Sequence, residues 1–242
     1  MLNCQAFRQA PPPGPRVMQY LEAFARLRVL TLGDLMLDCY VEGTPARLSP
    51  EAPVPVVEVE QETWTPGGMG NACVNAAALG ARVVPVGVIG SDAAGDRLTS
   101  QLRSRGIPDA GLVRVPGRKT TLKTRILAGT QQIVRMDIET RTPIPTPVEE
   151  SVLRQVWERI SEADVVLVCD YAKGLLTPRV LAETIRAARA AGVPVCVDPK
   201  RADFRQYGGA TVITPNLKEA AAFSGITIET HRDLEPAAAE LM

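Results

Sequence analysis

The stretch ADVVLVCDYAKGLLTPRVLAETIRAARAAGVPVCVDP (163–199) decides the fold. Two apolar runs, at 163–170 and 193–199, flank a predicted helix over 178–191. Continuous apolar runs are typical of strands covered on both faces, and strands that alternate with helices build parallel sheets. The same pattern recurs in RVLTLGD (28–34), RVVPVGVIG (82–90) and ATVITPN (210–216). We therefore predict an α/β fold with a mostly parallel central sheet and helices on both of its faces.

Two other segments have a different pattern. Val57 and Val59 alternate with glutamates, and TLKTRILAGTQQIVRMDIE (121–139) alternates around Gly129. Alternation with a period of two predicts strands with one exposed face, and a glycine at the midpoint predicts a hairpin turn. Such strands do not fit a sheet that is covered on both faces. We expect them to form a small accessory sheet beside the main one.

Composition and charge exclude several classes of function. The chain has 242 residues with 27 basic and 27 acidic side chains, so no net field favours nucleic acid. No apolar run reaches membrane-spanning length, and the leading segment MLNCQAFRQAPPPGPR (1–16) lacks the apolar core of a signal peptide. Five cysteines without a CxxC pair predict a reduced, cytoplasmic protein. The single histidine, His231, excludes a multi-histidine metal site.

Each predicted buried strand is followed by a polar residue that can bind a ligand. Because the carboxyl ends of parallel strands meet at one edge of the sheet, these side chains are expected to face a common crevice. Carboxylates accept hydrogen bonds from hydroxyls, and together with phosphates they bind Mg²⁺. The simpler interpretation is that Asp and Asn favour strand ends and helix caps. The residues are Asp34, Asp92, Asp170, Asp198 and Asn216.

The stretch TPGGMGNACVN (65–75) predicts a tight glycine turn at the start of a helix. It is not a dinucleotide fingerprint, because the third glycine is missing and the preceding segment is half-exposed, and no Gly-Lys-Ser/Thr follows. Glycines let a ligand approach the backbone closely, and Asn71 adds an amide at the helix start. This arrangement suits a polyhydroxylated small molecule as well as a phosphate. A plain turn into an alanine-packed helix is the alternative.

Cations gather on the predicted hairpin. Lys123, Arg125 and Arg135 fall on alternate positions, with Asp137 beyond them, so one face of the sheet would carry three cations. Ammonium and guanidinium groups bind phosphates through charge-assisted hydrogen bonds. The pattern therefore fits a sugar phosphate, and a solvated strand face gives the same spacing.

Six motifs occur in one order along the chain: GDLMLDCYVEG, RLSPEAPVPVV, PGGMGNACVNAAALGA, DYAKGLL, VDPK and TPNLKEA. Together they resemble the ribokinase-like (PfkB) carbohydrate kinase family, from about Val29 to Phe223. SPEAPVPVV, GDLMLD and DYAKG look most like the branch that phosphorylates D-glycero-β-D-manno-heptose 7-phosphate in lipopolysaccharide core heptose biosynthesis. The resemblance implies a ribokinase-like fold and an ATP-dependent sugar kinase.

The resemblance also implies a substrate site beneath a small β-sheet lid. The lid would be formed by roughly residues 38–66 and 115–139, would close over the sugar and would mediate a homodimer. The heptose 7-phosphate kinase branch commonly has Arg at the position where this chain has Cys39. The site would contain carboxylates for the sugar hydroxyls, a glycine and amide platform, and cations for the phosphate. The expected substrate-binding residues are Asp34, Asp38, Gly67, Gly68, Asn71, Lys123, Arg135, Asp170 and Lys173.

A second set of residues would serve ATP and Mg²⁺. Asn216 and Glu219 match the family's Asn-x-x-Glu element, which arranges the metal and the nucleotide phosphates. The resemblance implies that Glu219 is a metal ligand and that Lys200 lies near the phosphates. These three residues are the expected cofactor-binding residues of the chain.

The family's Gly-Ala-Gly-Asp motif, which supplies the catalytic base and the anion hole, does not occur in the 242 residues. We therefore expect residues 1–25 to be an N-terminal extension and 26–242 to be a kinase domain whose C-terminal part is missing. This domain would have no catalytic base and would be inactive alone. The alternatives are another PfkB sugar or nucleoside kinase, and a non-catalytic remnant that binds sugar or dimerises.

Overall fold

The centre of the protein is a six-stranded parallel sheet. The computed structural model describes residues 15–201 and 203–240. The strand order is β10-β9-β8-β1-β4-β5, and every pairing is parallel, which confirms the predicted sheet. The apolar pattern did not predict β5, which adds an edge strand. The strands are β1 (Arg28–Gly33), β4 (Arg82–Gly90), β5 (Leu112–Val115), β8 (Val165–Cys169), β9 (Val195–Asp198) and β10 (Val212–Ile213).

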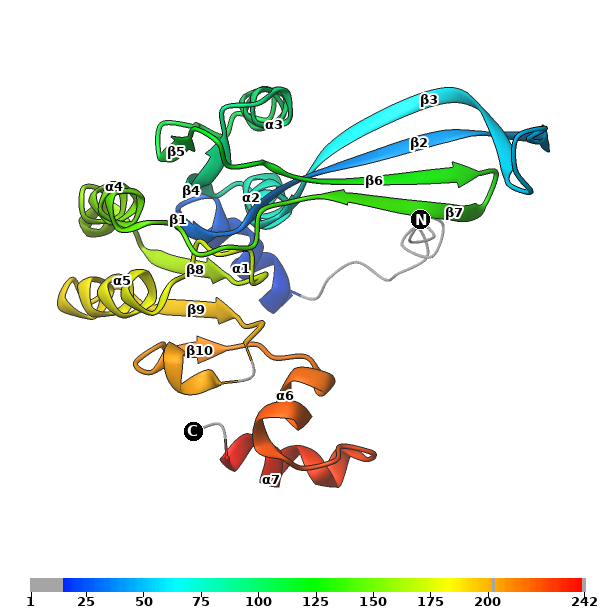
Figure 1. Ribbon diagram of the computed structural model, residues 1–242. Helices are drawn as coiled ribbons and strands as arrows, with labels where there is room; N and C mark the ends of the chain where they lie inside the picture. Colours follow the sequence, from blue (N-terminus) through cyan, green and yellow to red (C-terminus); the bar gives the residue numbers. More distant parts are fainter. Residues whose placement is uncertain (1–14, 202, 241–242) are drawn as a thin grey trace.

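Helices cover both faces of this sheet (Figure 1). Successive residues of a strand point to opposite faces, so β1 contributes to two cores. Val29 packs in the core that includes residues of α2 and α3, while Leu30 and Leu32 pack in the core that includes residues of α4 and α5. The helices are α1 (Pro15–Phe24), α2 (Met69–Ala78), α3 (Ala93–Arg103), α4 (Thr146–Trp157), α5 (Pro178–Ala190), α6 (Leu217–Ser224) and α7 (Leu234–Ala239).

A second sheet of four strands, called the lid sheet below, projects away from the main body (Figure 1). In the order β3-β2-β6-β7, β2 pairs antiparallel with β3 and parallel with β6, and β6 pairs antiparallel with β7. Gly129 adopts a φ of 59° between β6 and β7, so the predicted hairpin is confirmed. The strands are β2 (Leu35–Leu48), β3 (Pro55–Gly68), β6 (Thr121–Ala128) and β7 (Gln131–Ile138).

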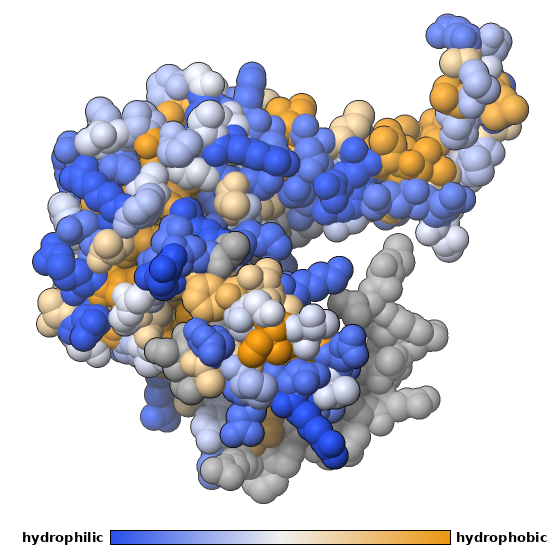
Figure 2. All heavy atoms as spheres, turned by 60° about the horizontal axis from the view of Figure 1, so that its bottom comes forward, coloured by the Kyte–Doolittle hydropathy of each residue, from blue (hydrophilic) through white to orange (hydrophobic). Residues whose placement is uncertain are grey.

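The lid sheet has one charged face and one apolar face. Along β7, Arg135 and Asp137 alternate with Val134, Met136 and Ile138, and alternate residues of a strand lie on opposite faces. The three apolar side chains are 43%, 49% and 52% exposed. Figure 2 shows apolar residues over the projecting arm. The charged face and the apolar face are therefore available for different contacts.

The predicted N-terminal extension lies partly outside the described residues, since α1 covers only Pro15–Phe24 of it. Cys39, Cys73 and Cys169 are free, buried thiols, and Cys196 is free and half-buried. No helix within 15–201 and 203–240 is long and apolar enough to cross a membrane.

Candidate functional site

Asp38 lies at the root of the lid sheet, beside the glycine turn. Arg125 donates through Nη1 to Asp38 Oδ1 at 2.7 Å, and the two side chains are only 20% and 17% exposed. A β-carbon on Gly67 would lie 2.1 Å from Asp38 Oδ2. The carboxylate therefore occupies space that exists only because residue 67 has no side chain. Within the part of the chain that the structure describes, its second oxygen accepts no hydrogen bond.

The glycine turn continues into α2. Gly68 precedes the helix with a φ of 56°, and its backbone passes so close to Asp34 that a β-carbon would lie 2.6 Å from the Asp34 carbonyl oxygen. The Met69 amide donates to that same oxygen at 3.0 Å. The helix begins at Met69, so Asn71 stands exposed in its first turn. The turn thus places Asn71 near the start of the helix, next to the end of β1.

Asp34 is buried, with 4% exposure, and its carboxylate holds the loop that follows β8. The amides of Tyr171 and Lys173 donate to Oδ2 at 3.0 Å, and that of Leu175 donates to Oδ1 at 3.3 Å. Burial raises the pKa of Asp34, and the amide hydrogen bonds offset only part of this rise. Both oxygens accept hydrogen bonds from backbone amides, so Asp34 holds the loop that follows β8. Its contact with sugar hydroxyls stays a prediction.

Asp170 is also engaged within the protein. It is 1% exposed, its Oδ1 accepts from the Ala172 amide at 2.8 Å, and its Oδ2 accepts from Arg201 Nε at 2.7 Å and the Tyr207 hydroxyl at 2.8 Å. The structure shows that Asp170 anchors the loop, and its predicted contact with the substrate stays a prediction. Arg201 and Tyr207 are site-supporting residues that no spacing in the sequence indicated.

The three predicted cations share the charged face of the lid sheet. Arg125 is opposite Arg135 and Lys123 is opposite Asp137 in the β6–β7 ladder. Asp137 accepts from Lys123 Nζ at 3.1 Å and from Arg135 Nε at 2.8 Å. Burial raises the pKa of Asp137, but these hydrogen bonds outweigh it and hold the pKa below its usual value. Near the root of the lid sheet, this face therefore places three cations beside the carboxylates of Asp38 and Asp137.

Asn216, Glu219 and Lys200 lie together beyond β9 and β10. Asn216 caps α6: its side chain accepts from the Glu219 amide, and Glu219 accepts from the Asn216 amide, both at 3.0 Å. Lys200 Nζ donates to Glu219 Oε1 at 3.0 Å. Burial, and then the charge of Glu219, raise the pKa of neighbouring Asp198.

The residues around Glu219 fit a magnesium ion only if a bound phosphate provides some of the oxygen ligands. Within the described residues, no cluster of three His, Cys, Asp or Glu side chains could hold a metal. Mg²⁺ commonly uses one or two carboxylates and takes its other ligands from phosphate and water oxygens. Glu219 and Asp198 match that pattern, and the Lys200 ammonium is of the type that binds phosphates.

Asp92 follows the simpler interpretation of a helix cap. Its Oδ1 accepts from the Gly95 amide at 2.9 Å and from the Thr120 hydroxyl at 2.7 Å, while Oδ2 accepts from the Thr120 amide at 2.9 Å. Thr120 directly precedes β6. Asp92 therefore ties α3 to the root of the lid sheet.

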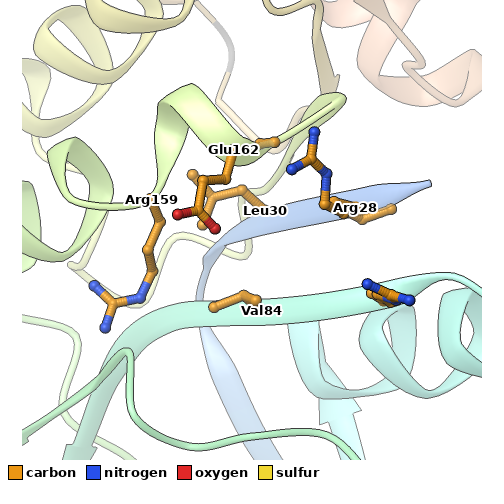
Figure 3. A pocket seen from close by; sticks show the side chains of 8 residues that line it. Arg28, Leu30, Val84, Arg159 and Glu162 are labelled. Atoms are coloured by element: carbon orange, nitrogen blue, oxygen red, sulfur yellow. The ribbon is translucent and has the colours of Figure 1, made fainter. Parts of the chain in front are cut away.

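A cavity of about 330 Å³ opens at the other end of the sheet, beside the amino ends of β1 and β4 (Figure 3). Its lining includes Arg28, Arg159 and Glu162. Neighbouring carboxylates offset the positive charge of both arginines, because Arg28 pairs with Asp164 at 3.2 Å and Arg159 pairs with Glu158 at 3.1 Å. None of the predicted site residues lines this cavity, so we do not include it in the site.

Comparison with known proteins decides the family. Residues 26–242 match the family described as pfkB family carbohydrate kinase. The chain belongs to this family. Among solved structures, phosphofructokinase-2 from Escherichia coli in complex with substrates and products has a TM-score of 0.70 at 22% identity, covering 89% of this chain and 69% of that one. Arabidopsis thaliana ribokinase complexed with ribose and ATP has a TM-score of 0.65 at 18% identity, covering 89% and 68%. These structures confirm the ribokinase-like fold.

Curated relatives are more similar in sequence. The chain is 45% identical over 226 residues to a bifunctional protein HldE from Citrifermentans bemidjiense, covering 93% of this chain and 46% of that protein. It is 47% identical over 221 residues to the bifunctional protein HldE of Caulobacter vibrioides, covering 91% and 45%. The chain thus spans about half the length of the curated relatives it matches.

Proposed function

We propose that this chain is the sugar-binding part of an ATP-dependent kinase that phosphorylates D-glycero-β-D-manno-heptose 7-phosphate at O1. One observation carries the proposal. The Asp38 carboxylate, placed by Gly67, shares a face of the lid sheet with Lys123, Arg125 and Arg135. A carboxylate that accepts hydrogen bonds from hydroxyls beside cations that bind a phosphate suits a phosphorylated sugar.

The assignment of heptose as the sugar rests on the sequence motifs and on the relatives. The stretches SPEAPVPVV, GDLMLD and DYAKG look like the heptose 7-phosphate kinase branch, and HldE proteins match about 90% of the chain. This supports lipopolysaccharide heptose biosynthesis as the setting. The free thiols of the described cysteines favour a reducing, cytoplasmic compartment.

The chain's own residues would bind and orient the sugar. Asp38 would accept hydrogen bonds from sugar hydroxyls through the oxygen that Arg125 leaves open. Asn71 would contribute an amide from the first turn of α2. The charged face of the lid sheet would lie toward the sugar and reduce its exposure to water, which strengthens charge-assisted hydrogen bonds.

The second group would take the nucleotide phosphates. ATP with Mg²⁺ would supply the phosphoryl group and neutralise its charge. Glu219 would hold the metal together with phosphate oxygens, and Asn216 would keep Glu219 in place through the capping box. Lys200, now paired with Glu219, would turn its ammonium toward a phosphate.

We infer that the 242 residues alone bind the sugar but turn it over at near-background rates. A positioned general base contributes about 10²–10⁴-fold, and one donor to the developing negative charge contributes about 10²–10³-fold. The motif that supplies both in this family does not occur in the sequence.

We also propose that the chain forms a homodimer through the apolar face of the lid sheet. Val134, Met136 and Ile138 form an exposed apolar row on β7. Exposed apolar patches mark interaction sites more often than chance. The charged face remains free for the sugar in such a dimer.

Calorimetry with a ligand panel tests the sugar assignment. Heptose 7-phosphate is expected to bind about 100-fold more tightly than the unphosphorylated heptose, ribose, fructose 6-phosphate or adenosine, because a charge-assisted hydrogen bond is worth about 1.5–3 kcal/mol. Tighter binding of ribose, fructose 6-phosphate or adenosine would favour another PfkB kinase. A dimer that binds sugar, in a full-length protein without ATP turnover, would favour the non-catalytic alternative.

A further inference from the structure

An unassigned carboxylate lies where the lid sheet meets the loop that follows β8. Glu139 directly follows β7, and Lys173 lies in the loop after β8. Lys173 Nζ is 2.6 Å from Glu139 Oε2, and the two side chains are 13% and 9% exposed. A pair this well buried is far less screened than a surface ion pair. It therefore fixes the direction of the Lys173 ammonium.

The backbones on both sides of the pair are held as well. Asp34 accepts from the Lys173 amide at 3.0 Å. Arg118 donates to the carbonyl oxygen of Thr140 at 3.1 Å, to that of Thr142 at 3.0 Å and to that of Lys173. The loop and the segment that leaves the lid sheet are thus joined through one guanidinium. The main freedom left to Lys173 is its own flexible side chain, which Glu139 restrains.

Glu139 pairs with two cations, so it does not fully neutralise the Lys173 ammonium. Arg141 Nε donates to Glu139 Oε1 at 2.5 Å, and Arg141 is 71% exposed. Burial raises the pKa of Glu139, but hydrogen bonds from Lys173 and Arg141 outweigh it and hold the pKa below its usual value. One carboxylate is thus shared by two cations. The Lys173 ammonium carries three N–H donors, and its ion pair with Glu139 leaves donors that can face an anion.

Resting on the proposed function, we propose that Glu139 is a positioning residue that holds the Lys173 ammonium for the phosphate of the sugar phosphate. The lid sheet then contributes to phosphate recognition through its own charged face and also through a residue at its root. In the opposite arrangement, Glu139 would compete with the phosphate for Lys173. The two arrangements predict opposite effects when Glu139 is changed.

Calorimetry with heptose 7-phosphate and with unphosphorylated heptose distinguishes these two arrangements of Glu139 and Lys173. Glu139→Gln removes the charge, and Glu139→Asp keeps the charge but shortens the reach. Both are expected to lower the preference for the phosphorylated sugar about tenfold, because a flexible lysine must then be ordered on binding. The matched control Arg141→Gln, which removes the exposed partner of the same carboxylate, is expected to change it less than twofold. Tighter phosphate binding in Glu139→Gln would overturn the proposal.

A double-mutant cycle shows whether Glu139 acts through Lys173. In a Lys173→Met background, Glu139→Gln is expected to have no further effect on the preference. Full additivity of the two changes would contradict the proposal.

Acylation by an amine-reactive reagent, read by mass spectrometry, tests the pair without any sugar. In Glu139→Gln, Lys173 is expected to react several-fold faster, while exposed Lys119 and Lys218 react as before. Unchanged labelling of Lys173 would refute the positioning, whichever sugar binds. Faster labelling in a protein that does not bind heptose 7-phosphate would support the positioning and refute the proposed function.

Discussion

The Asp38 carboxylate and a side chain at position 67 exclude each other: a β-carbon on Gly67 would lie 2.1 Å from Asp38 Oδ2. Neither backbone can easily move aside, because both residues belong to the β2–β3 ladder, in which Met36 pairs with Gly67 and Asp38 with Thr65. Arg125 holds the carboxylate from its other side. The direction of the Asp38 carboxylate therefore depends on glycine at position 67.

The first prediction concerns Gly67→Ala. The added methyl group is expected to displace the Asp38 carboxylate and lower the affinity for heptose 7-phosphate about 10- to 100-fold, the worth of a hydrogen bond to a charged group. Asp38→Ala is expected to have a similar effect, and the double variant no more than either alone. Calorimetry gives the affinities, and circular dichroism checks the fold. Wild-type affinity in Gly67→Ala would show that Asp38 does not bind the sugar.

The second prediction concerns acid stability through Asp92. Burial raises the pKa of Asp92, but hydrogen bonds from Thr120 and Gly95 outweigh it, so the folded pKa lies below the usual value of an aspartate. The unfolded chain therefore takes up the proton first as the pH falls. The stabilisation by the Asp92 carboxylate is complete well above the pKa of the unfolded chain and is lost as the pH falls through the lower pKa of the folded state.

Asp92→Asn is accordingly expected to lower the free energy of unfolding by about 1 kcal/mol at pH 7, since an amide cannot accept all three hydrogen bonds. The difference from the wild type is expected to shrink as the pH falls to about 3. Urea unfolding between pH 3 and 7 measures it. Asp96→Asn, at the exposed start of the same helix, is the control. A difference that grows on acidification would contradict the sign.

The strands that carry the fold could be predicted because their apolar runs are unbroken. β5 escaped prediction because Arg114 interrupts its four residues and the strand pairs only with β4. Sequence position also predicted that Asp34 and Asp170 stand at strand ends. It could not predict their hydrogen-bond partners, because the amides that donate to the Asp34 carboxylate come from residues about 140 positions away. The hydrogen bonds that these two carboxylates make within the protein were therefore not predicted, and their contact with the sugar stays a prediction.

The residues that support the site were harder to predict than the residues expected to bind its ligands. Arg118 binds three carbonyl oxygens, and backbone acceptors leave no trace in the side-chain pattern. Glu139 was hidden because it continues the alternation of charged residues along β7, after Arg135 and Asp137. The glycines were more informative, since a close backbone approach admits only one residue type.

The third prediction concerns the apolar face of the lid sheet. Met136→Glu places a charge in the exposed apolar row on β7 and is expected to shift the protein from dimer to monomer, because a desolvated charge at an interface costs more than the contact provides. Sedimentation velocity over a range of concentrations measures the state. Arg135→Glu, one residue away on the charged face, is expected to leave the dimer intact. If both variants dimerise, the interface lies elsewhere.

The fourth prediction separates a helix cap from a metal ligand at Glu219. Glutamine at this position can still close the capping box with Asn216, so Glu219→Gln is expected to change the free energy of unfolding by less than about 0.5 kcal/mol. Loss of the ion pair with Lys200 adds little, because that lysine is 52% exposed. The affinity for Mg²⁺–ATP is expected to fall at least about tenfold, since an amide binds Mg²⁺ more weakly than a carboxylate. Calorimetry with and without Mg²⁺ measures this change, and Glu229→Gln is the exposed control. If Mg²⁺–ATP binds Glu219→Gln as it binds the wild type, Glu219 serves only to cap α6.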